Sequence, residues 1–299
     1  VEVGHQFGQL GFIPFALIFQ CKQRKANHGK EEPRPHRRTR YTRVMPLAPL
    51  GPSSSWETFF QARIFSDSLG HRLPFRLLLP PTLSTSELYP LVVLLHGAGE
   101  RGEDNQLQLG NGLGRLLTGS EARTQFPCIA VVPQCPVDAR WVEVDWTAER
   151  HVMPTQPSVP LGALLQLLDV LVRSGVDAGS AVAKVDLNRI YAVGLSMGGF
   201  GVWDLLSRRP QLFAAGVPIC GGADEAQARR LRSLPLWVFH GGLDPVVKPQ
   251  RSRQMVAALR AEGAAPRYTE YAEVGHDSWV KALQEPELLP WLFGQMRVQ

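Results

Sequence analysis

Short, continuously apolar runs recur along the chain and indicate buried strands. Residues 89–95 (YPLVVLL) and 128–133 (CIAVVP) are apolar throughout, as expected of strands covered on both faces. The same pattern predicts strands at residues 189–194, 212–220, 234–240 and 265–272. Two earlier runs, 56–65 and 72–79, flank the polar turn SDSLGH and predict an antiparallel hairpin.

Segments with apolar residues at helical spacing lie between these strands. Residues 161–175 (LGALLQLLDVLVRSG) end on glycine, and residues 198–210 (GGFGVWDLLSRRP) stop at a proline. Weaker patterns predict helices at 106–117, 223–233, 249–263 and 286–296. A hairpin followed by repeated strand–helix units predicts an α/β fold, with a mostly parallel central sheet and helices on both faces. In such folds functional residues lie on loops at the carboxyl ends of strands.

The basic charge of the chain is confined to its first 45 residues. The 299 residues carry a formal net charge of +5, but residues 1–45 alone contribute +6 and the remainder carries −1. Because the basic excess is confined to residues 1–45, the charge argues against nucleic-acid binding by the rest of the chain. With 44% hydrophobic residues, the chain is rich enough in apolar side chains for a large core.

Residues 1–55 show no pattern that fits this fold. The apolar run 11–19 (GFIPFALIF) is too short to span a bilayer, and it lacks the basic flank and cleavage site of a secretory signal. The first methionine is Met45. We therefore expect 1–55 to be a leader and linker, with 1–44 either sequence upstream of the native start or a degenerate targeting segment. Residues 56–299 are expected to form the folded domain, with no membrane span and a cytoplasmic location.

The cysteines give no sign of disulfides or of a metal site. Cys21, Cys128, Cys135 and Cys220 form no C-x-x-C pair and show no metal-ligand spacing. A strand between Cys128 and Cys135 would hold their Cα atoms roughly 23 Å apart, beyond the reach of a disulfide. We expect buried free thiols, which suit a reducing compartment.

One serine stands between two glycines where a predicted strand meets a predicted helix. Gly194-Leu195-Ser196-Met197-Gly198 fits the pattern G-x-S-x-G in the strand–helix setting of a serine nucleophile. The turn is so tight that side chains two positions before and after the serine would collide with the strand and the helix. The N-terminus of the following helix would also direct backbone N–H groups toward a developing oxyanion.

Two other interpretations of this segment are weaker. A nucleotide-binding loop requires the spacing G-x-G-x-x-G near the start of the fold, and GLSMGGFG meets neither condition. A purely structural turn predicts no partner residues elsewhere in the chain. Partner residues therefore distinguish a nucleophilic serine from a structural turn, because a reactive serine hydroxyl needs a histidine to take its proton and a carboxylate to orient that ring.

Two histidines follow Ser196, and we expect His276 to be its partner. His276 lies in a loop after the last predicted strand (EVGHDSW), with Asp277 beside it as an expected helix cap. His240, like His96, ends a strand beside glycines, so both are expected to be structural.

Asp244 is the expected carboxylate of this group. It follows the strand closest in sequence to the His276 loop, in the motif HGGLDPVV. The alternative, Asp224, opens a predicted helix, where an acidic residue is favourable in its own right.

An oxyanion hole requires two backbone N–H groups. We expect one from Met197, which follows the serine. The other is expected from the loop HGAGERG, from Ala98 or alternatively Gly99. In the same loop Glu100 and Arg101 either form an ion pair or remain solvated.

Six motifs occur in the order found in a known family. LLHGAGERGEDN, VVPQCP followed by Trp141, GLSMGGFGVWDLLSRRP, VPICGGAD, FHGGLDPVV and EVGHDSW together resemble the α/β-hydrolase carboxylesterases also described as predicted peptidases. That group is related to phospholipase/carboxylesterase, dienelactone hydrolase and polyhydroxybutyrate depolymerase-like enzymes. The resemblance covers about residues 56–293 and implies an α/β-hydrolase catalytic domain. It also implies a triad of Ser196, Asp244 and His276, with oxyanion donors Ala98 and Met197.

The sequence thus predicts a serine carboxylesterase that hydrolyses small or soluble carboxylic esters through an acyl-enzyme, with no cofactor and no metal. The expected partner is a small-molecule ester. Trp141 and Trp146 lie in the aperiodic segment 141–160 and are expected either to line the substrate pocket or to belong to an ordinary packed connection. A serine peptidase with the same triad and a catalytically silent binding protein are the alternatives.

Overall fold

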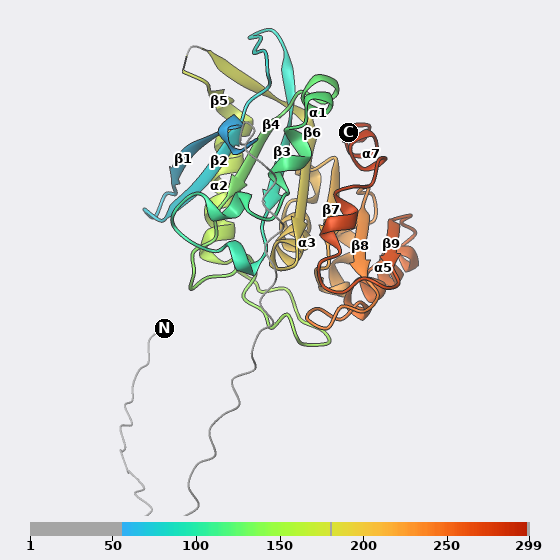
Figure 1. Cartoon of the computed structure of the whole chain (residues 1–299). Helices are drawn as coiled ribbons and strands as arrows, with labels where there is room; N and C mark the ends of the chain where they lie inside the picture. Colours follow the sequence, from blue (N-terminus) through green and yellow to red (C-terminus); the bar gives the residue numbers. More distant parts are fainter. Residues whose placement is uncertain (1–55, 180, 298–299) are drawn as a thin grey trace, which may run out of the picture. The chain divides into compact units, whose positions relative to one another are not determined.

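The computed structural model describes residues 56–179 and 181–297, which form a nine-stranded sheet flanked by helices (Figure 1). The expected leader and linker, residues 1–55, lies outside the described residues, and Cys21 with it. The strands are β1 (Phe60–Ser66), β2 (Arg72–Leu78), β3 (Leu88–Leu95), β4 (Ile129–Pro133), β5 (Val176–Asp177), β6 (Val182–Leu195), β7 (Ala215–Ile219), β8 (Trp237–Gly241) and β9 (Arg267–Tyr271). Their spatial order is β1-β2-β4-β3-β6-β7-β8-β9, and β5 pairs with β6.

Most of the sheet is parallel, as predicted. The run of strands from β4 through β3, β6, β7 and β8 to β9 pairs in parallel throughout. The predicted hairpin is also confirmed, because β1 pairs with β2 in antiparallel register from Phe60↔Leu78 to Ser66↔Arg72. This hairpin joins the rest of the sheet through an antiparallel pairing of β2 with β4.

Helices cover both faces of the sheet and enclose two cores. The helices are α1 (Ser120–Gln125), α2 (Val159–Ser174), α3 (Met197–Arg208), α4 (Ala228–Leu231), α5 (Gln250–Ala261), α6 (Trp279–Ala282) and α7 (Leu288–Phe293). Leu91, Val93 and Leu95 of β3 pack in the core with residues of α2, α3, α4 and α5, whereas Val92 and Leu94 pack in the core with α6 and α7. Successive side chains of a strand point to opposite faces, so a strand covered on both faces is apolar throughout.

Three of the predicted helices differ from the structure. Residues 106–117 form two 3₁₀ turns, Leu107–Leu109 and Gly114–Leu117, so the prediction of a helix there is wrong. The reason is Gly112, whose φ of 84° interrupts the helical backbone. The other two are shorter than predicted: residues 223–233 contain a 3₁₀ turn and the four-residue α4, and the final helix is the six-residue α7.

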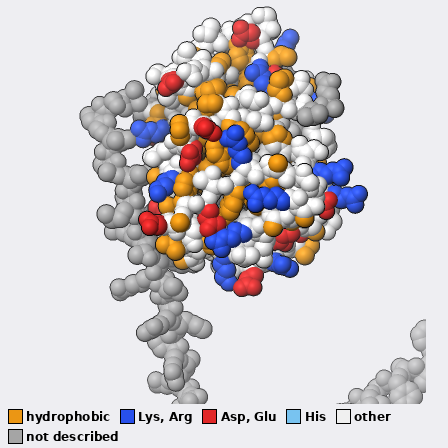
Figure 2. Space-filling model, turned by 90° about the vertical axis from the view of Figure 1, so that its right-hand side faces the viewer, with side chains coloured by type: hydrophobic (Ala, Val, Ile, Leu, Met, Phe, Trp, Pro, Cys, Tyr) orange, Lys and Arg blue, Asp and Glu red, His pale blue; other side chains and the backbone are white. Residues whose placement is uncertain are grey.

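The described part of the chain contains no helix that is long and apolar enough to cross a membrane. Figure 2 shows one face of the molecule, on which acidic and basic side chains are interspersed. This mixture agrees with the small net charge of residues 46–299.

The three cysteines of the described residues are buried free thiols, as predicted. Burial raises the pKa of the Cys128 thiol to about 12 and that of Cys135 also to about 12. These two thiols are therefore protonated at neutral pH.

Candidate active site

Ser196 occupies a strained turn between β6 and α3. Its φ of 52° and ψ of −119° lie in a region that residues other than glycine rarely adopt. The Ser196 N–H donates to the Ile219 oxygen of β7 at 2.9 Å, which holds the turn against the neighbouring strand. A strained backbone at a strand–helix turn is typical of a nucleophilic serine presented above a sheet.

The glycines around Ser196 are required by crowding, as predicted. A methyl group on Gly198 would lie 2.0 Å from the Leu95 carbonyl oxygen, and one on Gly194 would lie 2.5 Å from the Gly198 oxygen. The contacts on both sides are backbone atoms, which cannot move aside. Helix α3 can therefore begin against the end of β3 only because these positions carry no side chain.

His276 and Asp244 meet Ser196 at the carboxyl ends of the strands. Asp244 lies just after β8, and His276 lies between β9 and α6. The Nε2 atom of His276 is 2.8 Å from Ser196 Oγ, and its Nδ1 atom is 2.7 Å from Asp244 Oδ2. Three side chains far apart in the sequence thus form one continuous series of hydrogen bonds.

Donors on several sides hold the Asp244 carboxylate. Its Oδ1 accepts the N–H groups of Val246 and Val247 at 2.8 and 3.0 Å, and its Oδ2 faces His240 Nε2 at 3.3 Å in addition to His276. Burial raises the pKa of this carboxyl, but hydrogen bonds from His240 and His276 outweigh burial and lower the pKa below its ordinary value of 3.8. Asp244 is therefore ionised at neutral pH and able to orient an imidazole ring.

His240 is fully buried and structural, as predicted. Its Nδ1 lies 2.7 Å from Ser252 Oγ, and its Nε2 lies 2.9 Å from the Val247 oxygen. A carbonyl oxygen only accepts, so Nε2 carries a proton that also points toward Asp244. His240 thus ties the loop that carries Asp244 to helix α5.

His96 is likewise buried and structural, and Trp141 packs against it. The Nδ1 of His96 donates to the Gly97 oxygen at 2.6 Å, and its Nε2 accepts the Cys135 N–H at 2.9 Å. Burial lowers the pKa of His96 to about 4. Trp141 donates to the His96 oxygen at 3.1 Å and has no exposed surface, so it offers no wall to a substrate in this structure.

The aromatic side chain beside the histidine is Trp279, which the sequence analysis missed. Its ring lies 5.5 Å from that of His276 in a perpendicular arrangement. Trp146, by contrast, packs partly buried against the core, with the Arg140 guanidinium 4.3 Å above its ring. The motif EVGHDSW contains Trp279, and its position three residues after His276 was the available signal.

Asp224, the alternative carboxylate, is engaged elsewhere. Its Oδ1 accepts the Ala226 N–H at 3.1 Å at the start of a 3₁₀ turn, and its Oδ2 accepts the Met153 N–H at 3.0 Å. These contacts agree with its other interpretation, an acidic residue that is favourable at the start of a helix. Asp277 is exposed, and its backbone oxygen accepts the Val280 N–H at 3.0 Å. The N-cap residue of α6 is Ser278, so the expectation that Asp277 caps this helix is wrong.

The loop after β3 lies beside Ser196. A methyl group on Gly97 would lie 3.7 Å from Ser196 Cβ. Ala98 begins a 3₁₀ turn (Ala98–Glu100) and Met197 begins α3. The N–H groups at the start of a helix have no acceptor within that helix, so both amides are free to bind another group.

No ion pair joins Glu100 to Arg101 within residues 56–179 and 181–297. Arg101 instead donates to the backbone oxygens of Ala98 and Ala139, at 3.0 and 3.4 Å. Glu100 faces the Asn111 amide at 3.5 Å, and burial raises the pKa of its carboxyl. The loop is thus ordered by side-chain contacts with backbone and amide groups.

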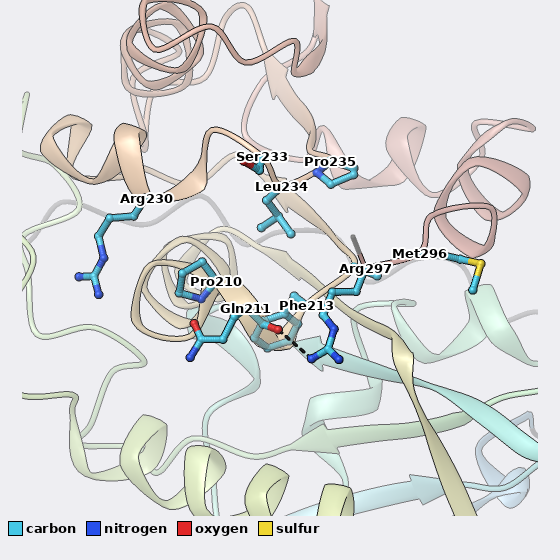
Figure 3. A pocket seen from close by; sticks show the side chains of 10 residues that line it. Pro210, Gln211, Phe213, Arg230, Ser233, Leu234, Pro235, Met296 and Arg297 are labelled. Atoms are coloured by element: carbon cyan, nitrogen blue, oxygen red, sulfur yellow. Dashed lines mark hydrogen bonds between the residues drawn. The ribbon is translucent and has the colours of Figure 1, made fainter. Parts of the chain in front are cut away.

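Two surface cavities lie at the opposite end of the strands from Ser196. The cavity in Figure 3 has a volume of about 460 Å³ and is lined by residues that precede β7 and β8, among them Phe213 and Pro235. At its edge Arg297 donates to the Gln211 oxygen at 3.1 Å. The second, of about 690 Å³, includes Tyr89 at the start of β3. Because parallel strands run from these residues toward the Ser196 end, neither cavity belongs to the site.

Comparison with known proteins identifies related hydrolases. Residues 167–284 match the Dienelactone hydrolase family. A solved structure described as a thermostable esterase is 38% identical, with a TM-score of 0.72, and the match covers 80% of this chain. This chain spans only 64% of that esterase, which is less than two thirds of its length. A search of the curated proteins found no match.

Two more distant structures share the fold. A ferulic acid esterase is 19% identical with a TM-score of 0.57, and the match covers 78% of this chain and 97% of that one. A puromycin-hydrolyzing peptidase of Mycobacterium tuberculosis is 16% identical with a TM-score of 0.56, and the match covers 80% of this chain and 41% of that one. The region that matches the family contains Ser196, Asp244 and His276. The chain therefore has the α/β-hydrolase fold, and its residues 167–284 resemble the Dienelactone hydrolase family.

Proposed function

We propose that the chain is a serine carboxylesterase that hydrolyses small or soluble carboxylic esters. The observation that carries this proposal is the hydrogen-bonded series from Ser196 Oγ to His276 Nε2, at 2.8 Å, and from His276 Nδ1 to Asp244 Oδ2, at 2.7 Å. The 38% identity to a thermostable esterase supports an ester as the substrate. The similar puromycin-hydrolyzing peptidase shares 16% identity and supports the fold alone.

The proposed reaction begins with proton transfer from the serine. A carboxylate oxygen only accepts, so neutral His276 holds its proton on Nδ1 and leaves Nε2 free to accept the Ser196 proton. The serine oxygen then attacks the ester carbonyl carbon. Asp244 keeps the ring in this tautomer and stabilises the imidazolium that forms.

The tetrahedral intermediate places negative charge on the former carbonyl oxygen. The proposed donors to this oxyanion are the N–H groups of Ala98, in the loop beside Ser196, and of Met197, the residue that follows it. His276 then protonates the leaving alcohol, which produces the acyl-enzyme. Water, activated by the same imidazole, releases the acid and restores the serine.

The proposal is tested by comparing ester and amide substrates. We expect turnover of p-nitrophenyl acetate and p-nitrophenyl butyrate, and much slower cleavage of peptide p-nitroanilides, because an amide has the poorer leaving group. Anilide rates that equal or exceed the ester rates would replace the esterase with a peptidase that uses the same residues. A panel of esters that varies in acyl length, including feruloyl and acetyl-sugar esters, would then define the acyl preference.

A further inference from the structure

A third potential metal ligand lies beside the histidine and aspartate of the site. Cys220, directly after β7, offers its sulfur, and the ligand atoms of Cys220, Asp244 and His276 all lie within 4.8 Å of one another. We propose that this cluster binds a thiophilic divalent cation such as Zn²⁺ or Cd²⁺, and that the bound ion blocks catalysis. The blocking of catalysis depends on the proposed esterase function, whereas the binding of the ion does not.

The three donors are those that zinc prefers in proteins. Zinc takes thiolate sulfur at about 2.3 Å, imidazole nitrogen at about 2.0–2.1 Å and carboxylate oxygen at about 2.0–2.2 Å, so the ligand atoms of a tetrahedral site stand about 3.3–3.7 Å apart. Atoms within 4.8 Å of one another reach these separations by shifts of about 1 Å. His276 is the movable member, because its side chain is 20% exposed and lies in a turn between β9 and α6.

A further buried side chain lies beside the Cys220 sulfur. Ser278 is fully buried, and its hydroxyl interacts with the Cys220 thiol. Its Oγ has no nitrogen or oxygen partner among the described residues, so this oxygen is available as a further ligand to a cation.

The charges of the cluster also suit a divalent ion. Asp244 is an ionised carboxylate with no exposed side-chain surface, and Cys220 is completely buried. A cation bound at this cluster would deprotonate the coordinating thiol outright. One carboxylate, one thiolate and one divalent ion sum to zero charge in the buried site.

Binding at this cluster removes the general base, whichever nitrogen of His276 is the ligand. If Nε2 binds the ion, its lone pair is no longer free to accept the Ser196 proton. If Nδ1 binds the ion, neutral imidazole must carry its proton on Nε2, which then faces the serine as a donor. The thiol proton leaves to solvent in either case, so each bound ion releases one proton.

The binding step is tested directly with Cd²⁺ and the full chain. We expect a thiolate-to-cadmium charge-transfer absorption that saturates at one ion per chain, measured in a Cys21→Ser background so that the leader thiol does not contribute. The inactive Ser196→Ala variant should give the same absorption, which separates binding from catalysis. If the Cys21→Ser protein shows no such absorption, the proposal is wrong, whether or not the protein hydrolyses esters.

The ligand assignment and the inhibition are tested with cysteine variants. Cys220→Ala should remove the absorption and raise the Zn²⁺ concentration that half-inhibits ester hydrolysis by about tenfold or more, because a ligand is lost. Cys128→Ala is the matched control, since this buried thiol directly precedes β4 and is not in the cluster, and the variant should change neither quantity. Unchanged cadmium absorption and unchanged zinc inhibition in a folded Cys220→Ala protein would overturn the assignment.

Discussion

The Nδ1 atom of His276 lies 2.7 Å from Oδ2 of Asp244, although the two residues belong to different loops and the carboxylate has no exposed surface. This contact determines the tautomer of the ring, because the carboxylate can only accept a hydrogen bond. The other ring nitrogen, Nε2, is thereby left as an acceptor 2.8 Å from Ser196 Oγ. The contact is therefore the structural basis of the proposed serine activation.

Replacing this carboxylate by an amide should disable the histidine without removing it. Asp244→Asn can donate to Nδ1 and favours the tautomer with the proton on Nε2, so we expect kcat for p-nitrophenyl acetate to fall by about 10⁴. Asp224→Asn is the matched control, because Asp224 contacts Met153 and Ala226 instead. Equal losses in the two variants would show that Asp244 has no special role.

His240 should act as a positioning residue for Asp244. Its Nε2 is 2.9 Å from the Val247 oxygen and 3.3 Å from Asp244 Oδ2. Loss of a hydrogen bond to a charged group costs about 1.5–3 kcal/mol, so we expect His240→Gln to lower kcat by about tenfold to a hundredfold with little change in KM. Steady-state kinetics on one ester measure both constants. A change confined to KM, or to the thermal midpoint, would contradict a positioning role.

Gly198 should tolerate no side chain. A methyl group at this position would lie 2.0 Å from the Leu95 oxygen and 2.7 Å from the His96 oxygen. Overpacking lowers the free energy of unfolding by about 1–3 kcal/mol or more. We expect the loss for Gly198→Ala to be about 3 kcal/mol or more, because the atoms that the methyl group would meet belong to the backbone. Gly119→Ala is the control, since nothing lies within 4 Å of the added methyl group. Urea unfolding of the two variants provides the comparison, and similar stabilities would refute the prediction.

Stability should decline as the pH falls from about 6.5 to about 4. Burial lowers the pKa of His96 from 6.5 to about 4, so in this window the unfolded chain binds a proton that the folded chain excludes. The folded state is then penalised increasingly toward low pH, by up to about 3 kcal/mol from this group. His151, whose pKa burial also lowers to about 4, adds to the same slope.

Urea unfolding at a series of pH values measures this effect. The free energy of unfolding of His96→Gln should depend less on pH than that of the wild type, because the variant has no imidazole to protonate at this position. A wild-type stability that stays constant between pH 7 and pH 4.5 would contradict the burial argument.

The residues brought together around Ser196 could be predicted because each has a local signal. Positions 194 and 198 must be glycine because a side chain there would collide with backbone atoms. The chain order of serine, acid and histidine left few candidates for the other two residues. The central strands could be predicted for a similar reason, since β3 is apolar at every position between two covered faces.

Features that depend on tertiary contacts could not be predicted from the sequence. Trp141 packs fully buried beside Gly201, a contact that no local pattern near the tryptophan indicates. The leucines of segment 106–117 have helical spacing, which predicted a helix. Gly112 adopts a φ of 84°, which is incompatible with a continuous helix. Cys220, Asp244 and His276 are far apart in the sequence, so their spacing gave no sign that they lie together in the fold.

The central claim is that Ser196 is the nucleophile of an ester hydrolase. The most direct measurement is kcat for p-nitrophenyl acetate in the Ser196→Ala variant, beside Ser233→Ala as a control at an exposed serine outside the site. We predict that Ser196→Ala lowers kcat by about a millionfold while the control keeps the wild-type rate. Retention of near wild-type turnover by folded Ser196→Ala would contradict the account.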